Sequence, residues 1–240
     1  MLLVFVDETS DSKFKEYFGL CCATINSSFY RQIKEDFQHI LVDGGWNPDV
    51  EFKGSYLFST LSGDTQVSIE KRIEIASNIL ALNTSKQNAR MKFTYLKLPP
   101  QQRQKDAYLE YLPVLLEKAL PKAEKRAGKD ILSLHCDRRD DITSREIYNA
   151  VIPIIRKRGY TLLEDIVISR SGFHTVGILY ADIVGYLYAR VDTIANDSEL
   201  FENVPPEQWE NNGKLKKLKS STTLLGLIKK FDRYQVVLKQ

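Results

Sequence analysis

Three aspartates of this chain stand where the local sequence predicts inward-facing positions. Asp7 ends the apolar run 2–6, and Asp137 ends a second apolar run. Asp182 is the one charged residue within 175–189, and its neighbours at helical spacing are apolar. Because ionised carboxylates are rarely buried unless they are paired, protonated or metal-bound, we expect all three to be metal ligands. For Asp7 the alternative is a cap at the end of its strand.

The chemistry expected of such a group is metal-assisted hydrolysis. The carboxyl ends of neighbouring parallel strands meet at one edge of an α/β sheet, where a helix packed over that edge can add a further side chain. Carboxylates gathered there repel one another unless divalent cations neutralise them, and Mg²⁺ or Mn²⁺ is the natural partner of oxygen ligands. A pair of such ions roughly 4 Å apart stabilises both the attacking and the leaving oxygen in phosphodiester hydrolysis.

The choice of Asp137 leaves alternatives open. It is followed by Arg138, Asp140 and Asp141, so any of the three aspartates can be the ligand and Arg138 can neutralise one of them. Asp140 or Asp141 can instead cap the helix that is predicted to begin near Thr143.

Hydrophobic periodicity predicts a mixed sheet covered by helices. The predicted strands are 2–6, 17–25 (antiparallel to the first), 90–97, 131–136 and 166–168, and the predicted helices are 27–41, 65–82, 101–126 (one or two helices around Pro113 and Pro121), 143–157 (broken near Pro153) and 173–193. Side chains alternate along a strand, so Glu8 is expected to point away from the face that carries Asp7.

Three short motifs resemble those of domain-of-unknown-function family 3800, which is grouped with ribonuclease H-like folds. They are Phe-Val-Asp-Glu-Thr-Ser-Asp at 5–11, Glu-Phe-Lys-Gly at 51–54 and Gly-Ile-Leu-Tyr-Ala-Asp-Ile-Val-Gly at 177–185. Ser10 stands where the family usually has glycine. The resemblance implies an RNase H-like mixed β-sheet flanked by α-helices. It also implies a divalent-metal site made of Asp7, Glu51, Asp137 and Asp182.

Two further polar residues are candidates for the same site. Lys53 is expected either to bind a phosphate of the substrate or to pair with a carboxylate. His174 lies eight residues before Asp182, about 12 Å along a helix, so the two cannot ligate one ion. It is expected either to act as a base on an attacking water or to be structural.

The composition is that of an ordinary globular protein. The 240 residues are 43% hydrophobic and 27% charged. We expect one RNase H-like domain at 1–195, with an inserted helix near 27–42, followed by a linker and a basic extension at 196–240 that packs on or extends from the core.

The positive charge is concentrated near the carboxyl end. Residues 211–240 hold eight Lys or Arg and one Asp, whereas the whole chain has a net charge of only +3. Lys214, Lys216, Lys217 and Lys219 are expected to contact a nucleic-acid backbone, and the alternative is a solvated helix face.

Several classes of protein lack their signatures in this sequence. Three cysteines are too few for a disulfide framework and are expected to be buried in the core, and no signal peptide or stretch of roughly 20 apolar residues is visible. Phosphate-loop, dinucleotide and serine-hydrolase motifs are absent as well. These features indicate a cytoplasmic protein with no membrane segment.

The function expected from these features is a divalent-metal-dependent nuclease that hydrolyses phosphodiester bonds of DNA or RNA. The alternative is a non-catalytic nucleic-acid- or protein-binding module of a phage or defence system with the same fold. A metal phosphohydrolase that acts on small nucleotides is a third candidate.

Overall fold

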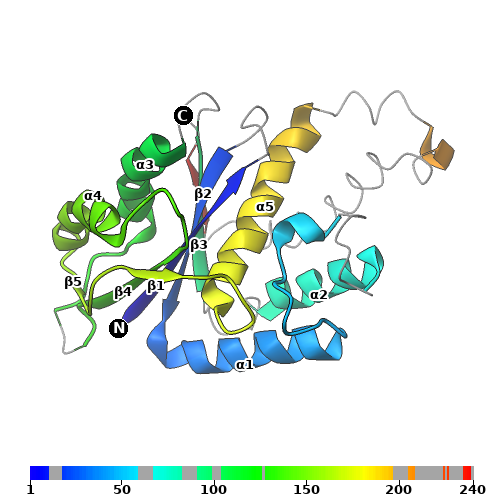
Figure 1. Cartoon of the computed structure of the whole chain (residues 1–240), viewed down its shortest axis with the longest axis horizontal. Coiled ribbons are helices and arrows are strands. Elements are labelled where there is room, and N and C mark those ends of the chain that lie inside the picture. The colour runs from blue at the N-terminus through cyan, green and yellow to red at the C-terminus, as the bar shows by residue number, and fades with distance from the viewer. Residues whose placement is uncertain are drawn as a thin grey trace.

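The computed structural model describes residues 1–10, 18–58, 67–82, 91–98, 104–125, 128–196, 205–208, 224, 226 and 235–238. Within these residues, seven strands form one mixed sheet and five α-helices cover its faces (Figure 1). The strands are β1 (Leu2–Ser10), β2 (Phe18–Asn26), β3 (Met91–Lys97), β4 (Ile131–Asp137), β5 (Thr161–Leu162), β6 (Val167–Ser169) and β7 (Gln235–Leu238). The helices are α1 (Ser27–Asp43), α2 (Ile69–Ala81), α3 (Gln104–Ala119), α4 (Ser144–Lys157) and α5 (Val176–Asn196), with short 3₁₀ turns at Gly54–Tyr56 and Pro206–Gln208.

Strand β1 is the centre of the sheet. The order is β5-β4-β1-β2-β3-β7, and β6 also pairs with β4. β1 runs antiparallel to β2 and parallel to β4, and β2 runs antiparallel to β3. The predicted mixed β-sheet flanked by α-helices is confirmed.

The apolar run of β1 is buried on both faces because each face is covered by its own layer of helices. Leu3 and Phe5 join the core formed with α1, α2 and α5, whereas Val4 and Val6 join the core formed with α3 and α4. Burying each such side chain contributes about 1.5–3 kcal/mol. The strand therefore holds the two layers together.

Helix α5 lies very close to the sheet, on the side opposite to α3 and α4 (Figure 1). A Cβ atom at Gly177 would stand 2.3 Å from the Phe5 ring, so only glycine fits there. At Gly185 a Cβ atom would lie 3.1 Å from the Cβ atom of Cys21. The glycines of the 177–185 motif thus set the height of α5 above β1 and β2.

Two expectations about helix α4 are wrong: a break near Pro153, and an aspartate as its cap. Helix α4 runs through Pro153 without a break. Ile147, Val151 and Ile155 are all buried there, and their burial outweighs the roughly 3 kcal/mol that an interior proline costs. The helix is capped by Thr143, whose hydroxyl accepts from the Glu146 backbone N–H in a capping box, and not by an aspartate.

Three further elements differ from expectation. Helix α5 begins at Val176, three residues later than predicted. Helix α3 is a single helix that contains Pro113, which is one of the two predicted alternatives. Neither β5 nor β7 was predicted from the sequence. β7 pairs in parallel with β3 at the edge of the sheet, and Leu224 is buried in the core that includes α5. The proposed division of the chain at residue 195 stays a prediction.

The cysteines are free and buried, as expected of core residues. None of the helices in the described ranges has the length and apolar character needed to cross a lipid bilayer.

Candidate metal-binding site

Asp7 and Asp137 are neighbours on one face of the sheet. The parallel register pairs Val6 with Cys136, and each aspartate is the next residue along its strand. Along each strand the side chains alternate between the two faces of the sheet. The carboxylates of Asp7 and Asp137 therefore point to the same face, the one covered by α5. Asp7 is buried, with 7% of its surface exposed.

Helix α5 carries Asp182 over the same place. Gly185, one turn further along the helix, packs against Cys21, which pairs with Asp7 across β1 and β2. Positions three apart share one side of a helix, so Asp182 faces the same part of the sheet. It is enclosed by protein on most sides but keeps some contact with solvent.

The segment around the 3₁₀ turn at Gly54–Tyr56 docks on α5 at Asp182. The Gly54 backbone N–H donates to Asp182 Oδ2 over 2.6 Å. A Cβ atom at Gly54 would lie 2.6 Å from Tyr186 Cβ, so a glycine is required for this approach. The contact brings Glu51 and Lys53 to the site, where Lys53 Nζ lies 3.1 Å from Glu51 Oε2.

The fourth part of the site is the segment before α5. Asp137 Oδ1 accepts hydrogen bonds from the Ser171 hydroxyl (2.7 Å) and the Ser171 backbone N–H (3.2 Å). A cavity of about 500 Å³ opens here, and its walls include Glu51, Lys53, Asp137 and Arg170. The cavity therefore has both acidic and basic groups in its walls.

Burial and mutual repulsion disfavour the ionised form of these carboxylates. Burial raises the pKa of Asp7 well above its usual range, and the charges of Asp182 and Asp137 raise it further. Burial likewise raises the pKa of Asp182 to about 6; Glu51 and Asp137 add to the rise, while the Gly54 N–H and Lys53 oppose it. Positive charge at this point would stabilise both groups.

Each aspartate has one oxygen fixed by a hydrogen bond. Asp7 Oδ1 accepts from the Glu8 backbone N–H (2.7 Å), and Gly54 and Ser171 serve Asp182 and Asp137 in the same way. Within the described ranges the second oxygen of each has no hydrogen-bond donor. Such free, oriented carboxylate oxygens are the donor type that Mg²⁺ and Mn²⁺ prefer.

The acidic side chains lie farther apart than the ligands of one metal ion do. In the part of the chain that the structure describes, no three His, Cys, Asp or Glu side chains gather closely enough to hold one metal ion. The donor set fits a hard divalent cation, and binding such an ion would require the carboxylates to draw together.

Glu8 faces away from Asp7, as strand alternation predicts. It pairs with Arg139, which also binds Asp141 over 2.9 Å and whose side chain is only 7% exposed. Arg138 pairs with the exposed Asp140, so it neutralises one of the three aspartates, as expected, and that aspartate is not Asp137. The sequence did not single out Arg139, because its role depends on a loop that follows the end of β4.

His174 is not brought together with the acids. It lies in the turn before α5, where its Nδ1 is 3.2 Å from Gln38 Nε2, and it lines a different cavity. Lys214, Lys216, Lys217 and Lys219 lie outside the described residues.

Sequence reasoning also missed Gly54, Ser171 and Arg170. Gly54 ends the Glu-Phe-Lys-Gly motif at 51–54, which the sequence analysis had already noted. The glycine directly after Lys53 could therefore have indicated its role. Ser171 and Arg170 stand in a polar segment with no periodicity, and nothing in the sequence marked them.

Comparisons with known proteins give a distant likeness in structure. No protein-family model matches the chain, and no curated protein matches it. The ribonuclease H2 structure from Pyrococcus horikoshii OT3 aligns with 11% identity and a TM-score of 0.45, over 83% of this chain and 77% of that one. The structure of the PCNA:RNase HII complex from Archaeoglobus fulgidus aligns with 12% identity and a TM-score of 0.45, over 93% of this chain and 89% of the other. At these values the likeness carries no argument about activity.

Proposed function

We propose that this chain is a divalent-metal-dependent nuclease that hydrolyses phosphodiester bonds of DNA or RNA. The observation that carries the proposal is that Asp7, Asp137 and Asp182, from β1, β4 and α5, face the same part of the sheet, near enough for their charges to raise the pKa of Asp7. Each has one oxygen held by a hydrogen bond and one free. On the motifs quoted above, we further propose that the chain belongs to domain-of-unknown-function family 3800.

The ligands proposed for Mg²⁺ or Mn²⁺ are Asp7, Asp137 and Asp182, with Glu51 beside them. A bound ion would supply Lewis-acid stabilisation of the phosphoryl oxygens and a water of lowered pKa. The Gly54 N–H and the Ser171 hydroxyl hold two of the carboxylates in place, as outer partners of metal ligands generally do.

Two cationic side chains in the wall of the same cavity are suited to binding the substrate. Lys53 is paired with Glu51 yet remains 41% exposed at its side chain, and Arg170 lines the cavity beside it. Both are suited to binding the non-bridging oxygens of a phosphodiester. Binding there would place the phosphate next to Asp137, which lines the same wall.

The test is an isosteric substitution with a matched control. Asp182→Asn keeps the acceptor for Gly54 but removes the charge, whereas Asp106→Asn removes an exposed charge from α3 on the opposite face of the sheet. Purified proteins are given labelled single-stranded and double-stranded DNA and RNA with Mg²⁺, Mn²⁺ or EDTA.

Wild type and Asp106→Asn should cleave with metal and fail with EDTA. Asp182→Asn should lose at least about a hundredfold in rate, because a metal ligand acts on the transition state directly. Full activity of folded Asp182→Asn would refute the assignment. Mn²⁺ titration followed by electron paramagnetic resonance should show weaker binding by the same variant.

The alternative is a non-catalytic nucleic-acid- or protein-binding module of a phage or defence system. The loose spacing of the acids in the described residues favours it over a preformed metal site. Salt-sensitive binding of nucleic acid that is insensitive to EDTA, with no cleavage of any substrate, would support this alternative.

A further inference from the structure

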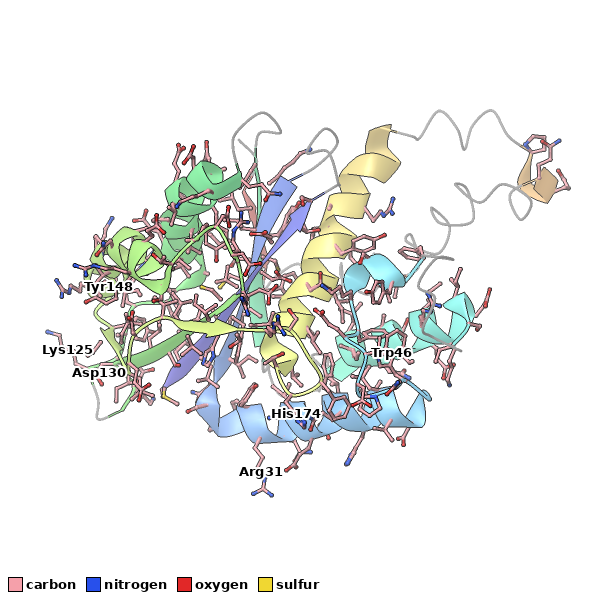
Figure 2. All side chains as sticks on the ribbon, in the orientation of Figure 1. Arg31, Trp46, Lys125, Asp130, Tyr148 and His174 are labelled. Atoms are coloured by element: carbon pink, nitrogen blue, oxygen red, sulfur yellow. The ribbon has the colours of Figure 1, made fainter. Side chains whose placement is uncertain are left out.

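A second cavity, of about 770 Å³, lies beside the acidic one. It is bounded by α1, β1, β4, β6 and the start of α5, and its volume is within the range of small-molecule sites. Figure 2 shows His174 at this place, between the start of α5 and α1. None of the proposed metal ligands lines this cavity, and neither does Lys53.

Three aromatic rings are stacked in its wall. Phe5 lies between Tyr30 of α1, with ring centroids 5.5 Å apart, and His135 of β4, with centroids 4.9 Å apart; the rings are inclined by 21° and 26°. Phe5 itself is buried, whereas Tyr30 and His135 are partly exposed and line the cavity. A planar ring that enters here can extend the stack.

The polar groups of the cavity suit a planar heterocycle. The carboxamide of Gln38 and the His174 ring stand together in the wall, 3.2 Å apart, and Ser169 lines it as well. These groups offer both donors and acceptors at the margin of a mostly apolar surface. This combination of a stacking surface with a few hydrogen-bonding groups is how proteins hold unpaired bases.

The two cavities are separated by one short segment. Residues 170–173 line the acidic cavity, whereas Ser169 and His174 on either side of them line the aromatic one. Along β4, His135 and Asp137 lie on the same face two residues apart, about 7 Å, one in each cavity. A single nucleotide spans that distance, with its phosphate at one end and its base at the other.

The rim of the aromatic cavity carries positive charge from α1. Arg31 projects from the helix (Figure 2) and is paired with Glu35, while Lys34 makes no ion pair with any residue of the described ranges. Lys34 is thus available for the next phosphate of a strand.

We propose that the aromatic cavity is a subsite for one unpaired nucleobase of the strand whose phosphodiester occupies the acidic cavity. The inference rests on the proposed function for the identity of the strand, and it narrows the substrate class to single-stranded nucleic acid or to a strand with an unstacked base. A base within a duplex is stacked on both sides and cannot enter a pocket of this kind.

The experiment measures binding without turnover. In the Asp182→Asn background, fluorescence anisotropy gives the dissociation constant of a labelled single-stranded oligonucleotide and of the same oligonucleotide with one abasic position, scanned along its length. Tyr30→Ala removes the stacking ring, Tyr30→Phe keeps it, and Phe29→Ala removes a 45% exposed aromatic of the same helix that does not line the cavity.

Tyr30→Ala should weaken binding of the intact strand about tenfold, the usual effect of removing one stacking partner. It should have little effect on the strand whose abasic position falls at the subsite, while Tyr30→Phe and Phe29→Ala bind both strands as the parent does. Thermal melting of each variant checks that folding is unchanged.

The outcomes separate the subsite from the nuclease. Cleavage by wild type together with equal binding by Tyr30→Ala would overturn the subsite and leave the proposed function standing. Tyr30-dependent binding without cleavage would support the subsite and count against the nuclease. Binding of AMP or CMP at this cavity with no binding of the oligonucleotide would overturn the assignment to a strand.

Discussion

Burial of the Asp182 carboxylate, which the proposed metal site requires, lowers the stability of the folded protein. Its pKa rises from an ordinary 3.8 to about 6 because burial disfavours the charged form. A carboxyl group with a raised pKa in the folded state stabilises the protein least when it is ionised. The fold therefore bears the cost of Asp182 at neutral pH.

The pH dependence of stability should reveal this cost. In EDTA, the contribution of Asp182 to the free energy of unfolding is fully present below about pH 4 and is lost as the pH rises to about 6. The loss is at most about 3 kcal/mol, since two pKa units correspond to that much and the carboxylate keeps some contact with water.

The measurement is urea unfolding of wild type and Asp182→Asn between pH 4 and 7. Asp182→Asn should match the wild type near pH 4 and exceed it at pH 7, because asparagine has no charge to bury. Groups that do not interact with Asp182 cancel in the difference. Removing the Asp182 charge also lowers the raised pKa of Asp7, which favours the variant at pH 7 in the same direction. A difference that does not change with pH would contradict the shifted pKa.

At the scale of elements, the docking of the segment around Gly54 on α5 decides where Asp182 points. Gly54→Ala should place a methyl group 2.6 Å from Tyr186 Cβ and push the N–H away from the carboxylate. Overpacking of this kind costs about 1–3 kcal/mol. Affinity for Mn²⁺ should fall along with the melting temperature.

Gly226→Ala is the matched control, because a Cβ atom at this exposed position meets no atom of the described residues within 4 Å. It should leave both quantities unchanged. If Gly54→Ala lowers the melting temperature but leaves Mn²⁺ affinity intact, the segment is a structural clamp and does not orient Asp182.

Elements with a strong local pattern were predictable from sequence, and contacts between distant segments were not. β1 and β4 could be predicted because each is a run of adjacent apolar residues in the sequence. These runs end at Asp7 and Asp137. The hydrogen bond from Gly54 to Asp182 joins residues 128 positions apart and depends on how α5 meets the sheet. β5 has two residues, too few for any periodicity.

At the scale of the whole molecule, the basic segment is the part of the proposed nucleic-acid interface that rests on sequence alone. Replacing Lys214, Lys216, Lys217 and Lys219 by glutamine should weaken binding of all nucleic acids alike, because lysines read the phosphate backbone and not the bases.

Binding isotherms at several salt concentrations provide the check. Each lysine that contacts a phosphate of single-stranded nucleic acid contributes roughly 0.7 to the slope of log affinity against log salt, so the quadruple variant should lose up to about 3 units of slope. Replacing the exposed Lys122, Lys125 and Lys129 gives a control with similar loss of charge elsewhere. An unchanged slope in the quadruple variant would assign these lysines to a solvated surface.

The pairing of β7 with β3 has a consequence for synthesis of the chain. Residues 235–238 complete a sheet edge formed by residues 93–96, so roughly 140 residues must be translated in between. At about 5–20 residues per second, this edge waits some 7 to 30 s for its partner on the ribosome. During that time β3 presents unpaired backbone groups to other nascent chains, and the charge of Lys92 on its exposed side is the kind of feature that discourages such contacts. The sheet is thus finished only after residues 235–238 have left the ribosome.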